Sequence, residues 1–282
     1  MLNTCVGYSR AMYSNWLWHR PLQLVIDAGE GLPLALGTSV FAPSIVALTH
    51  GHSDHILGLP GLAGARRFGK GAPTKPWTVV YPDGSDAIMA MRTLIAALWR
   101  DVTFPITWTP LAPGARLPLD GTRALEAFAV THVPPLPAVG YRVVEARKRL
   151  KVEYAHLPQD AIELAARREG RQVLMEPFEH VVFAHSGDAM PIDAALVEGA
   201  DLLVHDATFL SADDRREPIH ATSVEALDLA RVAGVRTLIL THLSTRYDRD
   251  AAIGRLREQV AASGFHGLCF LLDESAFIDL RA

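Results

Sequence analysis

The sequence THGHSDHILGLPG at residues 49–61 directly follows an apolar run. Within six positions it holds four side chains that commonly bind metals: His50, His52, Asp54 and His55. The chain has only 12 histidines in 282 residues, so chance clustering is a poor explanation. Without a metal ion, these side chains would be desolvated together and would repel one another once protonated. The stretch therefore predicts a metal site.

Length and composition suit one large α/β domain over residues 1–282. With 49% hydrophobic residues, the chain can bury a large core. No apolar run approaches the roughly 20 residues of a membrane helix. The N-terminus also lacks the basic segment followed by an apolar segment that marks a signal peptide. We therefore expect a cytoplasmic protein without a membrane partner.

Cysteine content and charge restrict the type of metal site and partner. Only Cys5 and Cys269 are present, which excludes a disulfide framework and a cysteine-rich zinc module. Any metal must therefore be held by histidine and carboxylate ligands, which suit Zn²⁺ and, less selectively, Mn²⁺ or Fe²⁺. The net charge of -4 means that a nucleic-acid partner requires a local basic patch.

Short apolar runs alternate with helical patterns along the chain. The runs expected to be buried strands are residues 22–26, 45–48, 79–81, 181–184, 202–204 and 237–240. The patterns expected to be helices are residues 85–99, 159–169, 223–233 and 250–262. This alternation predicts an α/β fold. Neither a repeat nor a linker divides the sequence.

Five apolar runs are followed by a histidine or an aspartate: His50, His132, Asp188, Asp206 and His242. Side chains at the C-terminal ends of neighbouring strands can converge on one site. The pattern therefore predicts one metal centre assembled from distant segments. His50 and His52 can bind one ion from a turn, while Asp54 and His55 face a second.

A second ion would suit phosphodiester chemistry. Two metals roughly 3.5–4 Å apart can share a hydroxide and stabilise both the attacking and the leaving oxygen. Asp188 is the natural carboxylate to bridge them. Taken alone, His132 or His242 would more often be an ordinary buried histidine, and only the cluster favours the role of a ligand.

The motif HGHSDH resembles the signature H-x-H-x-D-H of the metallo-β-lactamase superfamily. Within it, the chain resembles RNase Z, the endonuclease that trims the 3′ end of precursor tRNA, and is closest to the short form. The motifs that carry this likeness are HSDHILGLPGL, THVPPLPAVGYRV, FAHSGDAMP and LILTHLSTRY. The resemblance spans about residues 27–247 and implies a four-layer αββα sandwich with a dinuclear site at one edge.

The resemblance also implies two divalent ions, most simply Zn²⁺, with a ligand set for each. One ion would be bound by His50, His52, His132 and Asp188. The other would be bound by Asp54, His55, Asp188 and His242. Asp54 would in addition accept the proton of the nucleophile, so the expected mechanism is metal-assisted hydrolysis.

Two further motifs resemble sequence boxes of the RNase Z branch. LLVHDATFL resembles the His-Glu-Ala-Thr box, and PIHATSVEALDLA resembles the His-Ser-Thr box. By position, Asp206 would orient His220, and His220 would help to protonate the leaving oxygen. Without that context, either residue is more often a helix cap or a loop group. The chain departs from the family at Asp206, where Glu is usual, at Ala221, and in the segment GYSRAMYSNWLW that replaces a glycine-rich first strand.

A basic segment precedes the HSGD motif. Residues 142–171 contain eight Lys/Arg and five Asp/Glu, a local charge of +3. RNase Z enzymes carry an arm that grips tRNA here, and we expect a short arm at about residues 145–175. Its candidate phosphate-binding residues are Arg147, Lys148, Arg149, Lys151, Arg167 and Arg168. An ordinary solvated helix with mixed charges explains this segment equally well.

A second basic stretch follows the first motif and contains no acidic residue between His55 and Pro82. Its cations are Arg66, Arg67, Lys70 and Lys75. Contacts with phosphate would explain this composition, and a solvated helix end explains it almost as well.

The sequence therefore favours a metal-dependent phosphodiester hydrolase, an RNase Z-like endonuclease that removes the 3′ trailer of precursor tRNA. The resemblance makes a homodimer the expected assembly, in which the arm of one subunit grips the tRNA cut by the other. The alternative is a small-molecule hydrolase of the same fold, acting on a cyclic nucleotide, another phosphodiester, a sulfate ester or a lactone. A non-enzymatic metal-binding protein is disfavoured because all seven expected ligands are present.

Overall fold

The computed structural model describes residues 4–69, 74–102 and 104–282, and these residues form two β-sheets. In the described chain the first sheet has six strands, in the order β1-β2-β3-β4-β5-β6. They are Cys5–Arg10, Ser14–His19, Leu24–Ile26, Ile45–Ala47, Trp77–Pro82 and Ile106–Leu111. The second sheet has eight, in the order β14-β13-β12-β11-β10-β9-β8-β7. From β7 to β14 they are Arg116–Pro118, Arg123–Ala129, Val139–Leu150, Met175–His185, Leu203–Asp206, Thr237–Thr241, Leu268–Asp273 and Ala276–Asp279.

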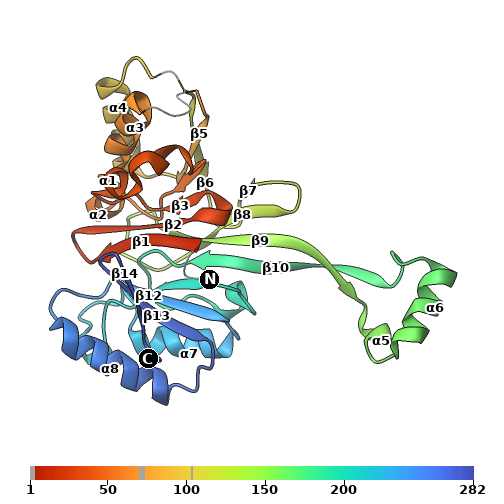
Figure 1. Cartoon of the computed structure of the whole chain (residues 1–282). Helices are drawn as coiled ribbons and strands as arrows, with labels where there is room; N and C mark the ends of the chain where they lie inside the picture. Colours follow the sequence, from red (N-terminus) through yellow and green to blue (C-terminus); the bar gives the residue numbers. More distant parts are fainter. Residues whose placement is uncertain (1–3, 70–73, 103) are drawn as a thin grey trace.

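Helices cover the outer face of each sheet (Figure 1). Beside the first sheet lie α1 (Leu32–Leu36), α2 (Ser53–Ile56), α3 (Leu59–Phe68) and α4 (Asp86–Leu98). Beside the second lie α7 (Ser223–Val232) and α8 (Arg249–Ala262). No helix in the described part of the chain combines the length and the apolar character that crossing a bilayer requires.

Three apolar clusters separate the layers, and burial of this apolar surface is the main force that holds them together. One lies between the sheets and includes Leu24, Val80, Val204 and Ile239. Another joins the first sheet to its helices through Val46, Leu59 and Ile88. The third joins the second sheet to α7 and α8 through Leu227, Leu240 and Leu256. The predicted four-layer αββα sandwich is confirmed.

The predicted strands and helices are present in the structure, with small differences at their ends. The six apolar runs correspond to β3, β4, β5, β10, β11 and β12. The four helical patterns correspond to α4, α6 (Gln159–Glu169), α7 and α8. The segment GYSRAMYSNWLW, which resembled no family strand, forms the hairpin of β1 and β2. Five of the six residues of β2 are buried, so this strand lacks the alternation that marks a half-buried strand.

Parallel pairing brings the chemically important loops to one edge. In the first sheet β3, β4 and β5 are parallel, and in the second β10, β11 and β12 are parallel. The C-terminal ends of parallel strands point the same way, so the segments after them meet at that edge. His50 follows β4, Asp188 follows β10 and His242 follows β12.

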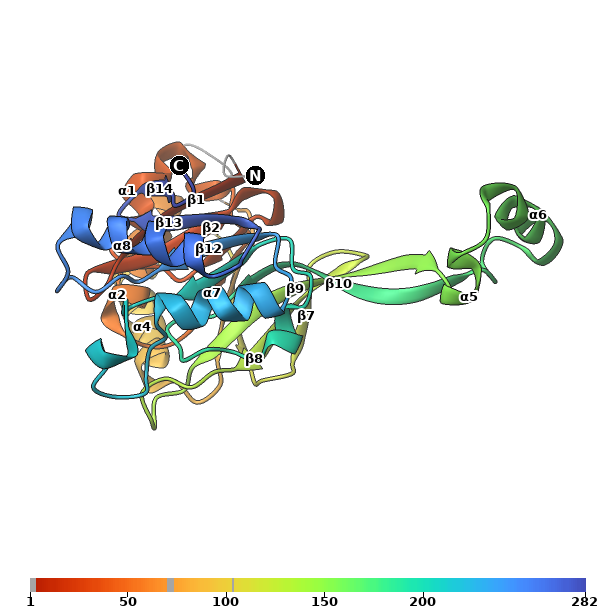
Figure 2. The same ribbon diagram turned by 90° about the horizontal axis from the view of Figure 1, so that it is seen from below.

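The strands β9 and β10 continue outward as an antiparallel pair, with Leu150 opposite Met175 at the far end. That end carries α5 (Val152–Ala155) and α6, which stand clear of both sheets (Figures 1 and 2). We call residues 145–175 the arm. Neither α5 nor α6 has a fully buried residue. Helix α6 ends at Gly170, whose φ of 91° lies in the region that favours glycine.

Ion pairs fix the base of the arm to the second sheet. Arg116 contacts Glu126 at 2.7 Å and also contacts Glu179 on β10. Arg142 on β9 contacts the same Glu126 at 2.6 Å. Glu126 is only 6% exposed, so it holds two cations where water has little access.

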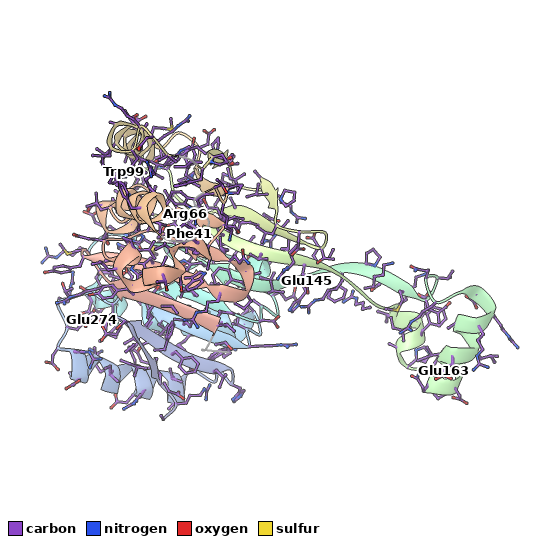
Figure 3. The ribbon with its side chains drawn as sticks, turned by 45° about the horizontal axis from the view of Figure 1, so that its top comes forward. Phe41, Arg66, Trp99, Glu145, Glu163 and Glu274 are labelled. Atoms are coloured by element: carbon purple, nitrogen blue, oxygen red, sulfur yellow. The ribbon has the colours of Figure 1, made fainter. Side chains whose placement is uncertain are left out.

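Two cations of the second basic stretch, Arg66 and Lys75, bind backbone carbonyl oxygens. Arg66 is 1% exposed and donates to three backbone carbonyl oxygens at 2.8–3.2 Å, and it lies beside Phe41 in Figure 3. Lys75 also donates to backbone carbonyls, and Arg67 pairs with Asp101. Lys70 lies outside the described residues. The prediction of phosphate contacts is wrong for Arg66 and Lys75, because these cations hold neighbouring loops together instead.

Candidate metal centre

The seven side chains predicted as metal ligands lie together at the edge where the parallel strands end. Three overlapping groups each offer ligand atoms within 4.8 Å of one another. The first contains His50, His52, His132 and Asp188. The second contains Asp54, His55 and His242, and the third contains Asp188, Asp206, His220 and His242.

The turn after β4 and the helix that follows it supply four of the seven. His50 and His52 lie in the turn, and α2 begins at Ser53 and carries Asp54 and His55. Gly51 allows the turn to approach α4, because a Cβ there would lie 2.9 Å from the Cβ of Ala87.

The second sheet supplies Asp188 and His242 from tight turns. Gly187, with φ of 65°, packs against Thr49, where an added Cβ would lie 2.8 Å from the Thr49 Cβ. His242 itself has φ of 64°, which is uncommon for a residue with a side chain. Such strained backbone is found mainly where the surrounding structure enforces it, often at functional sites.

The nitrogen atoms of the first group have the spacing of metal ligands. His52 Nδ1 lies 3.0 Å from His50 Nε2 and 3.4 Å from His132 Nε2. Ligands about 2.0–2.1 Å from a tetrahedral zinc ion lie about 3.3 Å from one another. The donor set therefore fits a divalent ion of that size.

Asp188 lies between the first and second groups. Its Oδ2 atom is 3.9 Å from His50 Nε2, 3.4 Å from His55 Nε2 and 3.1 Å from His242 Nε2. Asp54 Oδ2 completes the second group, at 3.5 Å from His55 Nε2 and 3.7 Å from His242 Nε2. One carboxylate oxygen is therefore close to ligands on both sides.

Hydrogen bonds fix the tautomers of His50 and His55. The His55 Nδ1–H donates to Asp27 Oδ2 at 2.8 Å. The Thr49 hydroxyl donates to Asp27, so it can only accept from His50 Nδ1, which is 3.0 Å away. Both rings therefore turn Nε2, the atom available to a metal, toward the site.

The rings of His132 and His242 are held in the same way. His132 Nδ1 lies 3.0 Å from the carbonyl oxygen of Ile219, to which it donates. His242 Nδ1 lies 2.8 Å from the Thr208 hydroxyl. Among the described residues, the buried His242 Nε2 has no hydrogen-bond partner. This nitrogen lies 3.1 Å from Asp188 Oδ2, so a cation, either a proton or a metal ion, suits the space between the two atoms.

Burial sets the charge of the first group. Desolvation lowers the pKa values of His50, His52 and His132, so these rings are neutral at neutral pH. Neutral imidazole is the form that binds a metal. Burial alone would raise the pKa of Asp188, but His242 and His55 outweigh that effect and hold it well below its usual value.

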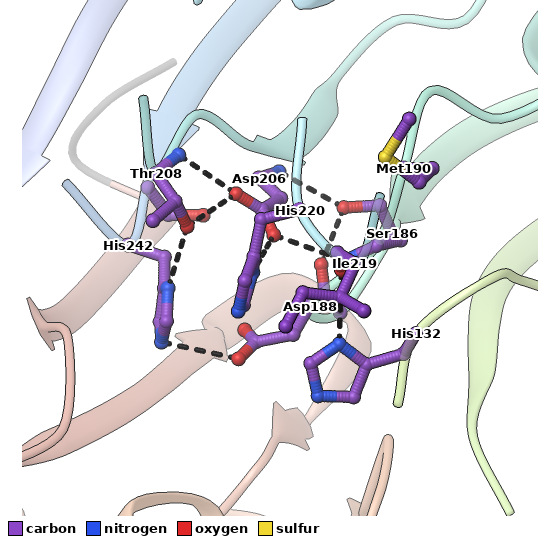
Figure 4. A network of polar contacts seen from close by, with 12 residues as sticks. His132, Ser186, Asp188, Met190, Asp206, Thr208, Ile219, His220 and His242 are labelled. Atoms are coloured by element: carbon purple, nitrogen blue, oxygen red, sulfur yellow. Dashed lines mark hydrogen bonds and ion pairs between the residues drawn. The ribbon is translucent and has the colours of Figure 1, made fainter. Parts of the chain in front are cut away.

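Asp206 and His220 form a pair beside the ligands (Figure 4). Asp206 is fully buried, and its Oδ2 atom accepts the His220 Nδ1–H at 2.6 Å. The shorter side chain of Asp, in place of the family's usual Glu, therefore reaches the histidine. Burial alone would lower the pKa of His220, but Asp206 outweighs that effect and raises it. His220 can thus carry a proton at neutral pH.

Three residues that sequence analysis missed support these side chains. Asp27 follows β3 and bonds to both His55 and Thr49. A strand end followed by Asp was the signal that identified the other positions, so it could have identified Asp27. Asn15 donates to Asp54 Oδ2 at 2.9 Å from the unpredicted hairpin, and Thr208 lies next to His242. The sequence carries no comparable signal for Asn15, whereas Thr208 lies in LLVHDATFL, at the Thr of the family box that this motif resembles.

The six cations predicted to bind substrate are distant from this site and all lie on the arm. Three of them, on β9, bond to acidic or amide side chains of the arm or of the adjoining Glu176: Arg147, Lys148 and Arg149. In the described structure, the others have no side-chain hydrogen bond or ion pair: Lys151, Arg167 and Arg168. Helix α6 carries two of these in its exposed last turn.

Comparison with known proteins identifies the family. The sequence profile of the Beta-lactamase superfamily domain matches residues 23–158 and 160–243. Ribonuclease Z of Halobacterium salinarum is 32% identical over 270 residues, covering 88% of this chain and 84% of that protein. The chain belongs to the ribonuclease Z family of the metallo-β-lactamase superfamily. The resemblance predicted from the motifs is therefore confirmed.

Solved structures agree with this assignment at the level of the fold. YhfI of Bacillus subtilis, a metallo-β-lactamase fold protein, has a TM-score of 0.67, 18% identity and coverage of 98% of this chain and 99% of that chain. The short form of human tRNase Z has a TM-score of 0.65, 19% identity and 99% coverage of both chains.

Its family shows that this ribonuclease Z relative is a metal-dependent phosphodiester hydrolase. The His/Asp cluster supports the binding of divalent metal. The predictions of an enzyme and of divalent metal binding are confirmed.

Proposed function

We propose that this chain is an endonuclease that removes the 3′ trailer of precursor tRNA in the cytoplasm. The observation that carries the proposal is the His220–Asp206 pair beside the metal-ligand cluster. A ribose hydroxyl is a poor leaving group, so its departure needs a proton donor. A histidine whose pKa is raised by a buried carboxylate supplies one at neutral pH.

We infer that two divalent ions bind here, and zinc suits the nitrogen-rich donor set best. Their ligands would be His50, His52, His132 and Asp188 for one ion, and Asp54, His55, Asp188 and His242 for the other. Bound there, the ions would polarise the phosphate and lower the pKa of water from 15.7 toward about 7. Mn²⁺ or Fe²⁺ would also be accepted.

The protein's own groups then handle the protons. Asp54 accepts the proton of the attacking water, and Asn15 orients its carboxylate through the 2.9 Å hydrogen bond. His220 donates its Nε2 proton to the leaving oxygen, while Asp206 holds the opposite nitrogen. Asp206 also stabilises the charged imidazolium before that transfer.

Precursor tRNA is far larger than the metal centre, so binding must use distant phosphate contacts, which are electrostatic. The arm supplies the candidate cations Arg147, Lys148, Arg149, Lys151, Arg167 and Arg168. The far end of the arm stands well away from the body of its own chain (Figure 2). A homodimer in which one arm grips the tRNA cut by the other subunit accounts for this geometry.

The test is incubation of purified protein with labelled precursor tRNA beside a small chromogenic phosphodiester. Cleavage of the tRNA after the discriminator base supports the proposal. Metal-stripped protein is the control for contaminating nucleases, because it should cut neither substrate until metal is restored. If the protein hydrolyses only the small ester, the proposal is wrong and the chain is a small-molecule hydrolase instead.

A further inference from the structure

The Asp206 carboxylate serves two histidines with different expected roles (Figure 4). Its Oδ2 atom accepts the His220 Nδ1–H at 2.6 Å. Its Oδ1 atom accepts the Thr208 hydroxyl at 2.7 Å, and that hydroxyl oxygen lies 2.8 Å from His242 Nδ1. Thr208 is therefore the link between Asp206 and His242.

Counting hydrogens fixes the direction of this chain of hydrogen bonds. The Thr208 hydroxyl has one hydrogen, and the ionised Asp206 carboxylate can only accept. The hydroxyl therefore donates to Asp206 and must accept from His242 Nδ1–H. The other tautomer of His242 would place a bare Nδ1 lone pair against the Thr208 oxygen. This arrangement places a hydrogen on His242 Nδ1 and turns Nε2 toward Asp188 and Asp54.

Burial makes the link difficult to replace. Asp206 is 0% exposed, and Thr208 and His242 are each 6% exposed, so water cannot easily take over a broken hydrogen bond. The backbone N–H groups of Ala189 and Thr208 also donate to the two Asp206 oxygens, at 3.0 and 2.8 Å. The carboxylate therefore cannot rotate to bond to His242 directly.

We propose that Thr208 is a positioning residue through which Asp206 orients His242 as well as His220. The inference rests on the proposed roles of His242 as a metal ligand and His220 as the proton donor. The two rings are stacked, with centroids 5.1 Å apart and planes inclined by 16°. One buried carboxylate thus sets the distance between the proton donor and one of the metal ligands.

The test compares Thr208→Val, which keeps the shape and removes the hydroxyl, with Thr208→Ser, which keeps the hydroxyl. NMR of the metal-free, histidine-labelled protein reports the His242 tautomer directly. We expect a hydrogen on His242 Nδ1 in the wild type and in Thr208→Ser, and a shift toward the form protonated at Nε2 alone in Thr208→Val. Chelator competition should show zinc affinity lowered about 10- to 100-fold by Thr208→Val only.

Thr241→Val is the matched control. Thr241 is 7% exposed, and its hydroxyl donates only a long 3.3 Å hydrogen bond to the His205 carbonyl. It should leave both the tautomer and the zinc affinity unchanged. Equal losses of affinity from the valine variants at positions 208 and 241 would overturn the inference, as would a Thr208→Val protein that keeps the hydrogen on His242 Nδ1.

A double-mutant cycle tests whether Thr208 acts through Asp206. If it does, Thr208→Val should lower zinc affinity far less in an Asp206→Asn background than in the wild type. Full additivity of the two losses would overturn the inference. The tautomer and affinity measurements use no substrate, so they remain decisive even if the protein proves unable to cleave tRNA.

Discussion

The metal centre and the arm use polar side chains in opposite ways. At the metal centre, His50, His55 and Asp206 are at most 2% exposed, and each has a hydrogen-bond partner that fixes its orientation. On the arm, α5 and α6 have no buried residue, and cations such as Arg167 project into solvent. Chemistry that needs fixed geometry is thus placed on buried strand ends, whereas the proposed attraction of a large anion relies on exposed charges.

The difference should appear as a difference in tolerance to substitution. A buried polar group that is deprived of its partner remains desolvated, so each change at the metal centre should have a large effect. An exposed cation is already solvated and screened, so each change on the arm should have a small one. The following predictions test that contrast from the largest expected effect to the smallest.

The largest effect is expected for Asp188→Ala, because Asp188 Oδ2 lies close to ligands of both proposed ions. Elemental analysis should find metal content strongly reduced. Turnover of precursor tRNA and of a small phosphodiester should both fall on the order of 10⁴-fold or more, since the low pKa of bound water is abolished. Glu163→Ala, at the far end of the arm in Figure 3, is the control and should change neither. A metal-replete, active Asp188→Ala protein would contradict the proposed centre.

The next effect is that of His220→Ala, which removes the proposed proton donor but no proposed metal ligand. Metal content should be retained, while tRNA cleavage falls about 10²- to 10⁴-fold. An ester with a very acidic leaving group should be affected much less, because it departs without a proton. Equal losses for both kinds of ester would show that His220 does not act as the acid.

The pH dependence should follow the raised pKa of His220. Cleavage of tRNA requires the protonated ring, so kcat/KM should fall as pH rises through that pKa. Asp206→Asn removes the charge that raises the pKa, so the alkaline limb of the profile should move to lower pH. The profiles should be measured with saturating zinc, because Asp206 also supports His242 through Thr208. An unmoved limb would mean that another group titrates.

Much of the metal centre could be predicted because strand ends repeat one pattern. An apolar run followed by His or Asp identified His132, Asp188 and His242, and these positions depend only on the topology of the sheets. Asp27 fits the same pattern, but its carboxylate acts through His55, and that contact depends on how α2 is oriented. Contacts of this kind require three-dimensional information that residue spacing does not contain.

The failed prediction at Arg66 has a related cause. A stretch without acidic residues can bind phosphate or can satisfy backbone carbonyls, and both need unpaired cations. Which one occurs depends on whether the guanidinium group turns inward. Here it turns inward, over the Phe41 ring and toward the carbonyl oxygens of Val40, Pro43 and Lys75.

Within the arm, free cations should matter more than paired ones. The triple substitution of Lys151, Arg167 and Arg168 by Gln should weaken tRNA binding and make it less dependent on salt. The slope of log K against log salt concentration should become shallower by about 0.7 to 0.9 for each phosphate that is no longer neutralised. The matched triple substitution at Arg147, Lys148 and Arg149 should do less, because those side chains already bond to acidic or amide side chains. Filter binding over a series of salt concentrations measures both.

Hydrolysis of a small phosphodiester should be unchanged in both triple variants, because the metal centre is untouched. If tRNA processing survives both sets of substitutions, the arm is only a solvated surface. If small-ester hydrolysis falls as well, the arm is coupled to the metal centre and the two regions are not independent.

The smallest effect is expected for Glu176→Gln, which breaks the exposed 2.7 Å ion pair with Arg149 on the arm. Exposed pairs contribute roughly 0.2–1 kcal/mol, so the free energy of unfolding should change by less than about 1 kcal/mol. The same change of charge at Asp27→Asn should cost about 1–3 kcal/mol, because Asp27 is 1% exposed and accepts hydrogen bonds from Thr49 and His55 that an amide cannot all accept. Urea denaturation of the metal-free proteins measures both without a contribution from bound ions. Equal losses of unfolding free energy from the two substitutions would show that a polar contact on the arm stabilises the fold as much as one at the metal centre. The proposed difference between the two regions would then be wrong.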